Sequence, residues 1–165
     1  LVTEDNLAPI VAEALDRIEK SAGFEAGALL ESVTVEIADL PGKQLGQSLD
    51  NTVWIDVDAA GYGWFIDATP GNDVEFSQRT ATDELMATFG SPARGWVDLL
   101  TTVVHELGHV LGLEHADGSG VMNELLPLST RRLFDDDILP IEEWQNVADR
   151  WDPVDVVFRS LGQRI

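Results

Sequence analysis

The most restrictive feature of this sequence is an apolar stripe that predicts one long, buried helix. The stripe consists of Val97, Leu100, Val104, Leu107 and Leu111. Spacings of three and four residues place all of these side chains on one side of an α-helix, which must then pack against other elements. Gly112 follows directly, and glycine readily adopts the positive φ with which many helices end. The rest of the chain has to supply the layers that cover this helix.

The remaining pattern predicts a single α/β domain, in the α+β sense, that spans residues 1–165. Apolar residues from Leu7 to Ile18 predict an N-terminal helix, capped by Thr3 or Asp5. The expected strands are residues 33–37, 52–58, 64–69 and 73–77, whereas residues 78–95 look irregular. A C-terminal helical part, residues 131–165, is expected to hold helices at about Ile141–Trp151 and from Asp152–Pro153 to Leu161. These elements predict a small, mixed, twisted sheet of about four strands, packed with helices.

Composition narrows the class of protein. With 10 Lys and Arg against 30 Asp and Glu, the net charge is −20, which disfavours binding to nucleic acid or to anionic lipid. No apolar run is long enough to span a membrane, so we expect no membrane insertion. The chain has no cysteine, which excludes disulfides and thiolate metal sites. It starts without Met, so we expect a mature form or a domain of a longer protein, and we expect that domain to be monomeric.

All three histidines lie on the buried helix or just after it. His105 and His109 fall on one helix face and can present two imidazoles to one ion. Gly112 lets the chain turn back, which brings His115 to the same ion. Three neutral imidazoles with a fourth position left open are typical of catalytic zinc. Glu106 points about 100° around the helix axis, so it can act as general base towards a zinc-bound water without ligating the metal.

Residues 105–115 read HELGHVLGLEH and match HExxHxxGxxH, the signature of the metzincin zinc endopeptidases, which this sequence resembles. Met122 corresponds to the methionine turn that lies beneath the zinc in that clan. Residues 58–70, with residues 40–42 and 97–101, resemble matrixin-type domains of large bacterial surface or secreted proteins. The resemblance implies the zincin-like metzincin fold, one catalytic Zn2+, hydrolysis of peptide or protein substrates, and an extracellular location.

The same resemblance implies a substrate cleft with the buried helix as its floor. An edge strand would pair with the extended backbone of the substrate, and we expect this strand to be Trp64, Phe65, Ile66, Asp67 and Ala68. The stretch after Met122 would form the wall of the specificity pocket. Its residues are Leu125, Leu126, Pro127 and Leu128.

The sequence departs from the matrixin pattern around a second metal site. Matrixins hold a structural zinc partly through histidines in this region, whereas Asp67 and Glu75 stand here. Calcium prefers oxygen ligands, so Ca2+ is one interpretation and solvated loop carboxylates are the other. The further carboxylates considered for it are Asp56, Asp58 and Asp73. Asn123 and Glu124 follow Met122, so no tyrosine ligand is expected.

Two other functions are compatible with parts of the pattern. A cell-surface or adhesion module could keep the zinc for stability without cleaving peptides, although such a module would not need Glu106. A gluzincin-like peptidase would take its third ligand from a distant glutamate, which Gly112, His115 and Met122 argue against.

Overall fold

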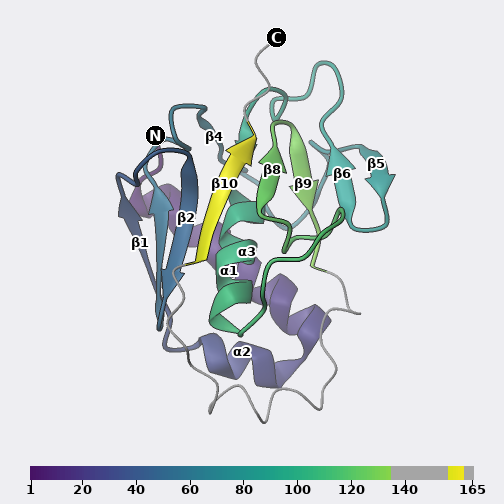
Figure 1. Ribbon diagram of the computed structural model, residues 1–165. Helices are drawn as coiled ribbons and strands as arrows, with labels where there is room; N and C mark the ends of the chain where they lie inside the picture. Colours follow the sequence, from purple (N-terminus) through teal and green to yellow (C-terminus); the bar gives the residue numbers. More distant parts are fainter. Residues whose placement is uncertain (135–155, 162–165) are drawn as a thin grey trace.

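The computed structural model describes residues 1–134 and 156–161 (Figure 1). Helix α1 (Glu4–Ala22) begins after Thr3, whose backbone N–H donates to the side chain of Asn6 at 2.8 Å. Its apolar stripe buries Leu7, Ile10, Ala14 and Ile18, as the spacing predicted. A short helix α2 (Phe24–Leu30) follows, and helix α3 (Leu99–Val110) is buried along its whole length. Helices α1 and α3 pack against each other, and α3 also lies against β2 and β3.

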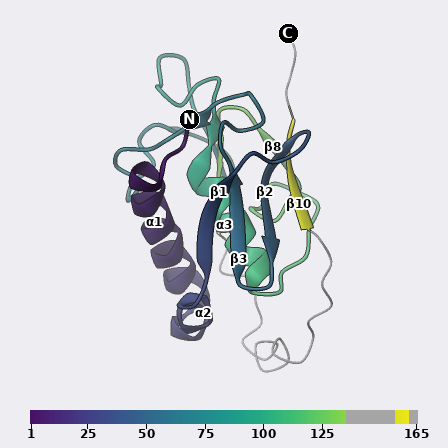
Figure 2. The same cartoon turned by 90° about the vertical axis from the view of Figure 1, so that its left-hand side faces the viewer.

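The main sheet is mixed and has the strand order β1-β3-β2-β10-β8 (Figure 2). Its strands are β1 (Thr34–Ala38), β2 (Gln44–Leu49), β3 (Thr52–Asp56), β8 (Leu125–Pro127) and β10 (Val156–Leu161). β1 runs parallel to β3, and β2 and β3 form an antiparallel hairpin. β10 is antiparallel to β2 and parallel to β8. The mixed sheet is thus confirmed, although only β1 and β3 of these strands were predicted, and β2, β8 and β10 were not.

Two smaller sheets lie outside the main one. β4 (Trp64–Phe65) pairs with β7 (Val97–Asp98), the strand that leads into α3. β5 (Gln78–Ala81), β6 (Glu84–Met86) and β9 (Thr130–Arg132) form the third sheet. The strand predicted at residues 64–69 is therefore only two residues long, and residues 73–77 form no strand. The segment predicted to be irregular, residues 78–95, contains a hairpin instead.

The C-terminal end differs most from expectation. A helix was predicted from residue 152 to Leu161, but residues 156–161 form strand β10. A short apolar run with β-branched residues fits a helix or a strand, and here two open strand edges decide the outcome. The helix expected at Ile141–Trp151 lies outside the described residues. None of the described helices has the length and apolarity needed to cross a lipid bilayer.

Candidate active site

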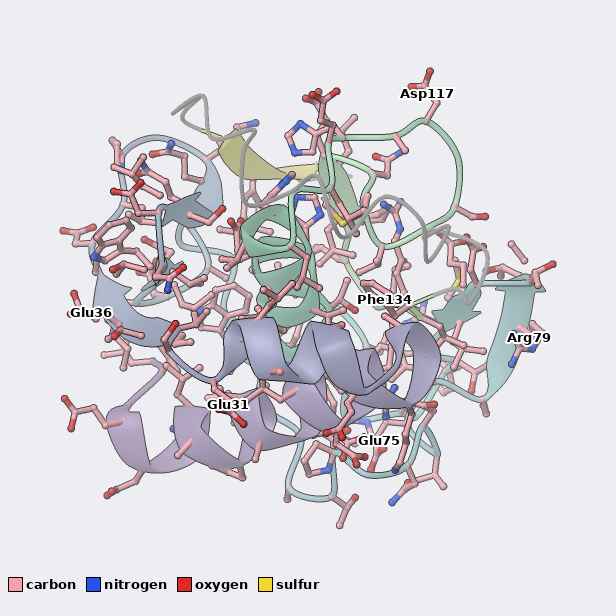
Figure 3. The ribbon with its side chains drawn as sticks, turned by 90° about the horizontal axis from the view of Figure 1, so that it is seen from below. Glu31, Glu36, Glu75, Arg79, Asp117 and Phe134 are labelled. Atoms are coloured by element: carbon pink, nitrogen blue, oxygen red, sulfur yellow. The ribbon has the colours of Figure 1, made fainter. Side chains whose placement is uncertain are left out.

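The second half of α3 and the turn after it bring the three histidines together. The Nε2 atom of His105 lies 2.9 Å from Nε2 of His109 and 3.2 Å from Nε2 of His115. Among the described residues, these three form the group whose ligand atoms could hold one metal ion. His105 and His109 are buried, whereas His115 is partly exposed, with Glu124 at 3.8 Å from its Nδ1 atom. The loop after His115 extends outward through Asp117, which Figure 3 labels.

A tight turn at the end of α3 orients His109. Gly112 has a φ of 84°, and its N–H donates to the carbonyl of His109 at 2.8 Å. The N–H of Leu113 donates to the carbonyl of Gly108 at 3.0 Å, which completes a Schellman motif. The motif turns the Leu113 carbonyl back towards the helix, where it accepts from Nδ1 of His109 at 2.7 Å. The predicted role of Gly112 as the turning point is confirmed.

The chain at the methionine turn orients the imidazole of His105. The carbonyl of Val121 accepts from Nδ1 of His105 at 2.7 Å. Met122 is buried, and its sulfur would lie 2.6 Å from a Cβ atom at Gly108, so a glycine is required at this point of close contact. Sequence reasoning placed Met122 near the site but missed Gly108, whose signal is simply a glycine inside a strong helix pattern.

These hydrogen bonds determine which nitrogens are available to a metal. Carbonyl oxygens only accept, so Nδ1 of His105 and of His109 carries the hydrogen and Nε2 is left with a free lone pair. Tetrahedral zinc with Zn–N bonds near 2.0–2.1 Å separates its ligand nitrogens by about 3.3 Å. The observed separations are close to that value, so the donor set fits zinc.

Burial keeps the three imidazoles neutral. It lowers the pKa of His105 well below its ordinary value and lowers the pKa of His109 to about 4. Burial also lowers the pKa of His115, partly offset by Glu124. Neutral imidazoles can bind a metal at pH 7 without first releasing protons.

Glu106 is the least satisfied polar group at this site. Its side chain is fully buried, and neither carboxylate oxygen has a hydrogen-bond partner among the described residues. Burial raises the pKa of Glu106 well above its usual range. The Ser48 side chain lies near the carboxylate without meeting hydrogen-bond geometry, and it lowers this pKa in part. An unpartnered buried carboxylate destabilises a fold, so its presence beside three convergent imidazoles points to chemistry rather than to packing.

The segment predicted to pair with substrate, residues 64–68, is largely engaged within the protein itself. Trp64 is buried and its indole N–H donates to the carbonyl of Asp56 at 2.7 Å. Phe65 packs edge-on against Phe76, and Ile66 contributes to the main core. Asp67 is buried in an ion pair, and only Ala68 of the five residues is exposed. β4 pairs with the strand that precedes α3, so the segment lies at the start of the helix, away from its histidines.

A buried ionic cluster at the start of α3 was not predicted. Asp98 caps the helix by accepting from the Thr101 N–H, and both its oxygens accept from Arg131, at 2.8 and 2.9 Å. Arg131 also pairs with Asp67 at 2.9 Å and with Asp73 at 3.0 Å. These partners are far apart in sequence, so no local pattern could have connected them.

The protein's own groups satisfy most of the carboxylates considered for calcium. Asp67 and Asp73 pair with Arg131, and Asp73 also pairs with Arg17 at 2.9 Å. Asp56 accepts from three backbone N–H groups, those of Leu40, Asp58 and Ala60, and Asp58 accepts from Gly61. Glu75 lies across the molecule from Asp117 (Figure 3). Within the described part of the chain, it belongs to no group of side chains that could hold a metal ion. The calcium interpretation is therefore not supported.

A comparison with family models matches the matrixin model, that of peptidase family M10, to residues 48–145. No curated protein and no solved structure matches the chain. The matched span covers more than half of the chain and includes the three histidines, Glu106 and Met122. Matrixins are metalloendopeptidases, and the three-histidine cluster fits their zinc site. The chain therefore belongs to the matrixin family of metzincin peptidases.

Proposed function

We propose that this domain is a zinc-dependent endopeptidase in which His105, His109 and His115 hold the zinc and Glu106 is the general base. The observation that carries the proposal is the state of Glu106. It is a fully buried carboxylate without a hydrogen-bond partner among the described residues, one position along the helix from a zinc-ligand candidate. A zinc site kept only for stability would not need such a group.

The residues of the chain divide the reaction between them. A bound zinc would act as a Lewis acid towards the scissile carbonyl and towards the attacking water. Glu106 accepts a proton from that water at its carboxylate and returns it to the nitrogen of the leaving amine. Its raised pKa suits both steps, since such a carboxyl group takes up a proton more readily than an exposed glutamate does. The carbonyls of Val121 and Leu113 keep the imidazoles of His105 and His109 in the metal-binding tautomer.

The test is to compare Glu106→Gln with a matched control, Glu114→Gln, in the zinc-loaded protein. Glu114 is an exposed glutamate in the loop after α3, and the two substitutions make the same chemical change. Cleavage of a quenched fluorescent peptide should fall by at least about 100-fold in Glu106→Gln, because general-base catalysis contributes that much or more. The control should keep the parent rate, and zinc analysis should give one ion per chain in all three proteins.

Undiminished cleavage in Glu106→Gln would place the base elsewhere. A parent protein that binds one zinc but cleaves no peptide would instead favour the adhesion-module reading, in which the metal only stabilises the fold.

A further inference from the structure

Strand β2 borders the candidate active site directly. A Cβ atom at Gly46 would come within 2.7 Å of the Cγ and Oε1 atoms of Glu106, so the carboxylate lies against the backbone of this strand. Side chains alternate between the faces of a strand, so Gln44 and Ser48 share the Gly46 face and Gln47 faces the other way. The Oε1 atom of Gln44 is buried and has no hydrogen-bond partner among the described residues. β2 therefore presents polar groups beside the proposed general base.

Strand β8 borders the site from the other side. It begins three residues after Met122, and the carbonyl of Val121, just before that methionine, orients His105. The side chain of Asn123 accepts from the N–H of Leu125 at 2.9 Å, which fixes the start of the strand relative to the methionine turn. β8 is thus attached to the part of the chain that supports the metal ligands.

Strand β10, the C-terminal strand of the described chain, lies between these two (Figures 1 and 2). Residues 156–158 pair antiparallel with residues 48–46 of β2, and residues 159–161 pair in parallel with residues 125–127 of β8. The register along β2 shifts between positions 158 and 159. Position 158 is directly opposite Gly46, the residue that contacts Glu106. After this shift, position 159 pairs with Gln44 of β2 as well as with Leu125 of β8, so β10 joins the two strands next to the proposed base.

An extended peptide binds a sheet by adding a strand to an open edge. In the described chain, β8 has β10 as its only strand partner, and the other edge of β2 is already taken by β3. Without β10, β2 and β8 would present two facing strand edges, with Glu106 lying against β2. A substrate peptide that uses these edges and β10 cannot occupy them together.

We propose that residues 156–161 of this chain occupy the substrate cleft between β2 and β8 and compete there with an extended peptide substrate. This inference rests on the proposed peptidase function. A tethered segment has an effective concentration near the millimolar range, so it outcompetes free peptides that bind weakly. The occupant is this chain's own strand, and the partner it excludes is an extended peptide.

The chain has no cysteine, so an engineered pair can lock β10 in place without competing thiols. Gln47→Cys with Val157→Cys places cysteines at partner positions of β2 and β10, where the Cα separation of antiparallel strands suits a disulfide. Position 47 faces away from Glu106, so the bond stays clear of the site. The matched control is Gln78→Cys with Met86→Cys, partner positions in the β5–β6 hairpin. Peptide cleavage and zinc content are measured before and after reduction of each disulfide.

In the Gln47/Val157 pair, we expect the oxidised protein to cleave peptide at least about tenfold more slowly than the reduced protein. Zinc content should be equal in both states, and the control pair should show no change in rate. Failure of the disulfide to form where the control forms it would overturn the placement of β10. A disulfide that forms without slowing cleavage would overturn its role as a competitor.

A second variant separates competition from a structural role. Val157→Pro removes a backbone N–H and disrupts strand pairing. Release of a competitor lowers the apparent KM for a peptide and leaves kcat unchanged. A strand needed only for stability would instead lower kcat and the melting temperature together, which would overturn the proposal.

The peptidase function and the occupation of the cleft by β10 are contradicted by different results. If the parent and every variant bind zinc but none cleaves peptide, the peptidase function is wrong. The cleft assignment is then judged by disulfide yield and by the binding of a fluorescent peptide with the sequence of residues 156–161. That peptide should bind Val157→Pro, in which β10 is released, and should not bind the oxidised Gln47/Val157 pair.

Discussion

The two ends of α3 differ in whether their buried carboxylates have a partner within the protein. At its start, Asp98 and Asp67 are buried carboxylates, and Arg131 pairs with both. In its second half, Glu106 is equally buried but has no hydrogen-bond partner among the described residues. The cation that would neutralise the surroundings of Glu106 is the one that the three imidazoles are arranged to hold.

The difference shows how structure and function can be distinguished within one helix. Buried charges that already have a protein partner orient and anchor the helix, and their chemistry is complete. Buried groups without a protein partner are costly, so they are found where a ligand or a reaction completes them. By this criterion the start of α3 anchors the helix, and the segment from His105 to His109 is the candidate active site.

The largest expected effect concerns the metal end of the helix. His109→Asn removes one of three converging donors, so stoichiometric zinc should be lost. In the parent, zinc at about 1,000 times its dissociation constant should stabilise the fold by about 4 kcal/mol, and this gain should disappear in the variant. Metal analysis after gel filtration and thermal unfolding with and without zinc measure both effects. Full zinc retention by His109→Asn would mean that the ligand set differs from the one proposed.

The second effect concerns the anchor end. Arg131→Met preserves much of the side-chain volume but leaves Asp98 and Asp67 buried without their cation, so unfolding free energy should fall by about 3–5 kcal/mol. The control is Arg79→Met on β5, an exposed site where the change should be within about 0.5 kcal/mol. Denaturant titration of the two metal-free variants gives the comparison. A loss below about 1 kcal/mol in Arg131→Met would show that the cluster does not anchor the helix.

The smallest effect tests the cost of the unpartnered carboxylate in the metal-free protein. Burial raises the pKa of Glu106 well above its ordinary value of 4.5, so the folded state holds more protons than the unfolded state above that pH. Stability that depends on Glu106 therefore declines as pH rises from about 4.5 through the raised pKa. Glu106→Gln does not titrate, so it should melt higher than the parent, by about 2–4 °C per kcal/mol gained. The gain should be larger at pH 8 than at pH 5.

Histidine ionisation is common to both proteins and cancels when the two melting curves are compared at each pH. A gain of equal size at pH 5 and pH 8 would contradict an ionised, unpartnered Glu106.

The spacing of residues along the chain predicted the features that lie within one short segment. The positions of His105, Glu106 and His109 follow from helix geometry, and Gly112 signalled the turn that brings in His115. Spacing could not reveal the Arg131 cluster, because Asp67 and Asp98 are 64 and 33 residues away from it. The catalytic roles, the extent of the domain and the extracellular location stay predictions.

The strands were harder to predict for two reasons. β2 contains Gln, Gly and Ser, residues with little strand preference, and it is a strand because it pairs with β3 and β10. β10 carries an apolar spacing that also suits a helix, and only its two neighbouring strands decide between the two. Residues 64–68, the segment expected to pair with substrate, lie at the start of α3, and their role in substrate binding stays a prediction.

The supports of the two buried imidazoles have a consequence for how this site tolerates mutation. Val121 and Leu113 hold His105 and His109 through main-chain carbonyls, which every amino acid possesses. Substitutions at these two positions can therefore change packing without removing the hydrogen bonds that set the tautomers. Substitutions should be tolerated least at two glycines. A side chain at Gly108 would displace Met122, and a side chain at Gly112 would strain the turn. Around the metal-ligand candidates, the backbone conformation thus limits which substitutions are tolerated more than side-chain chemistry does.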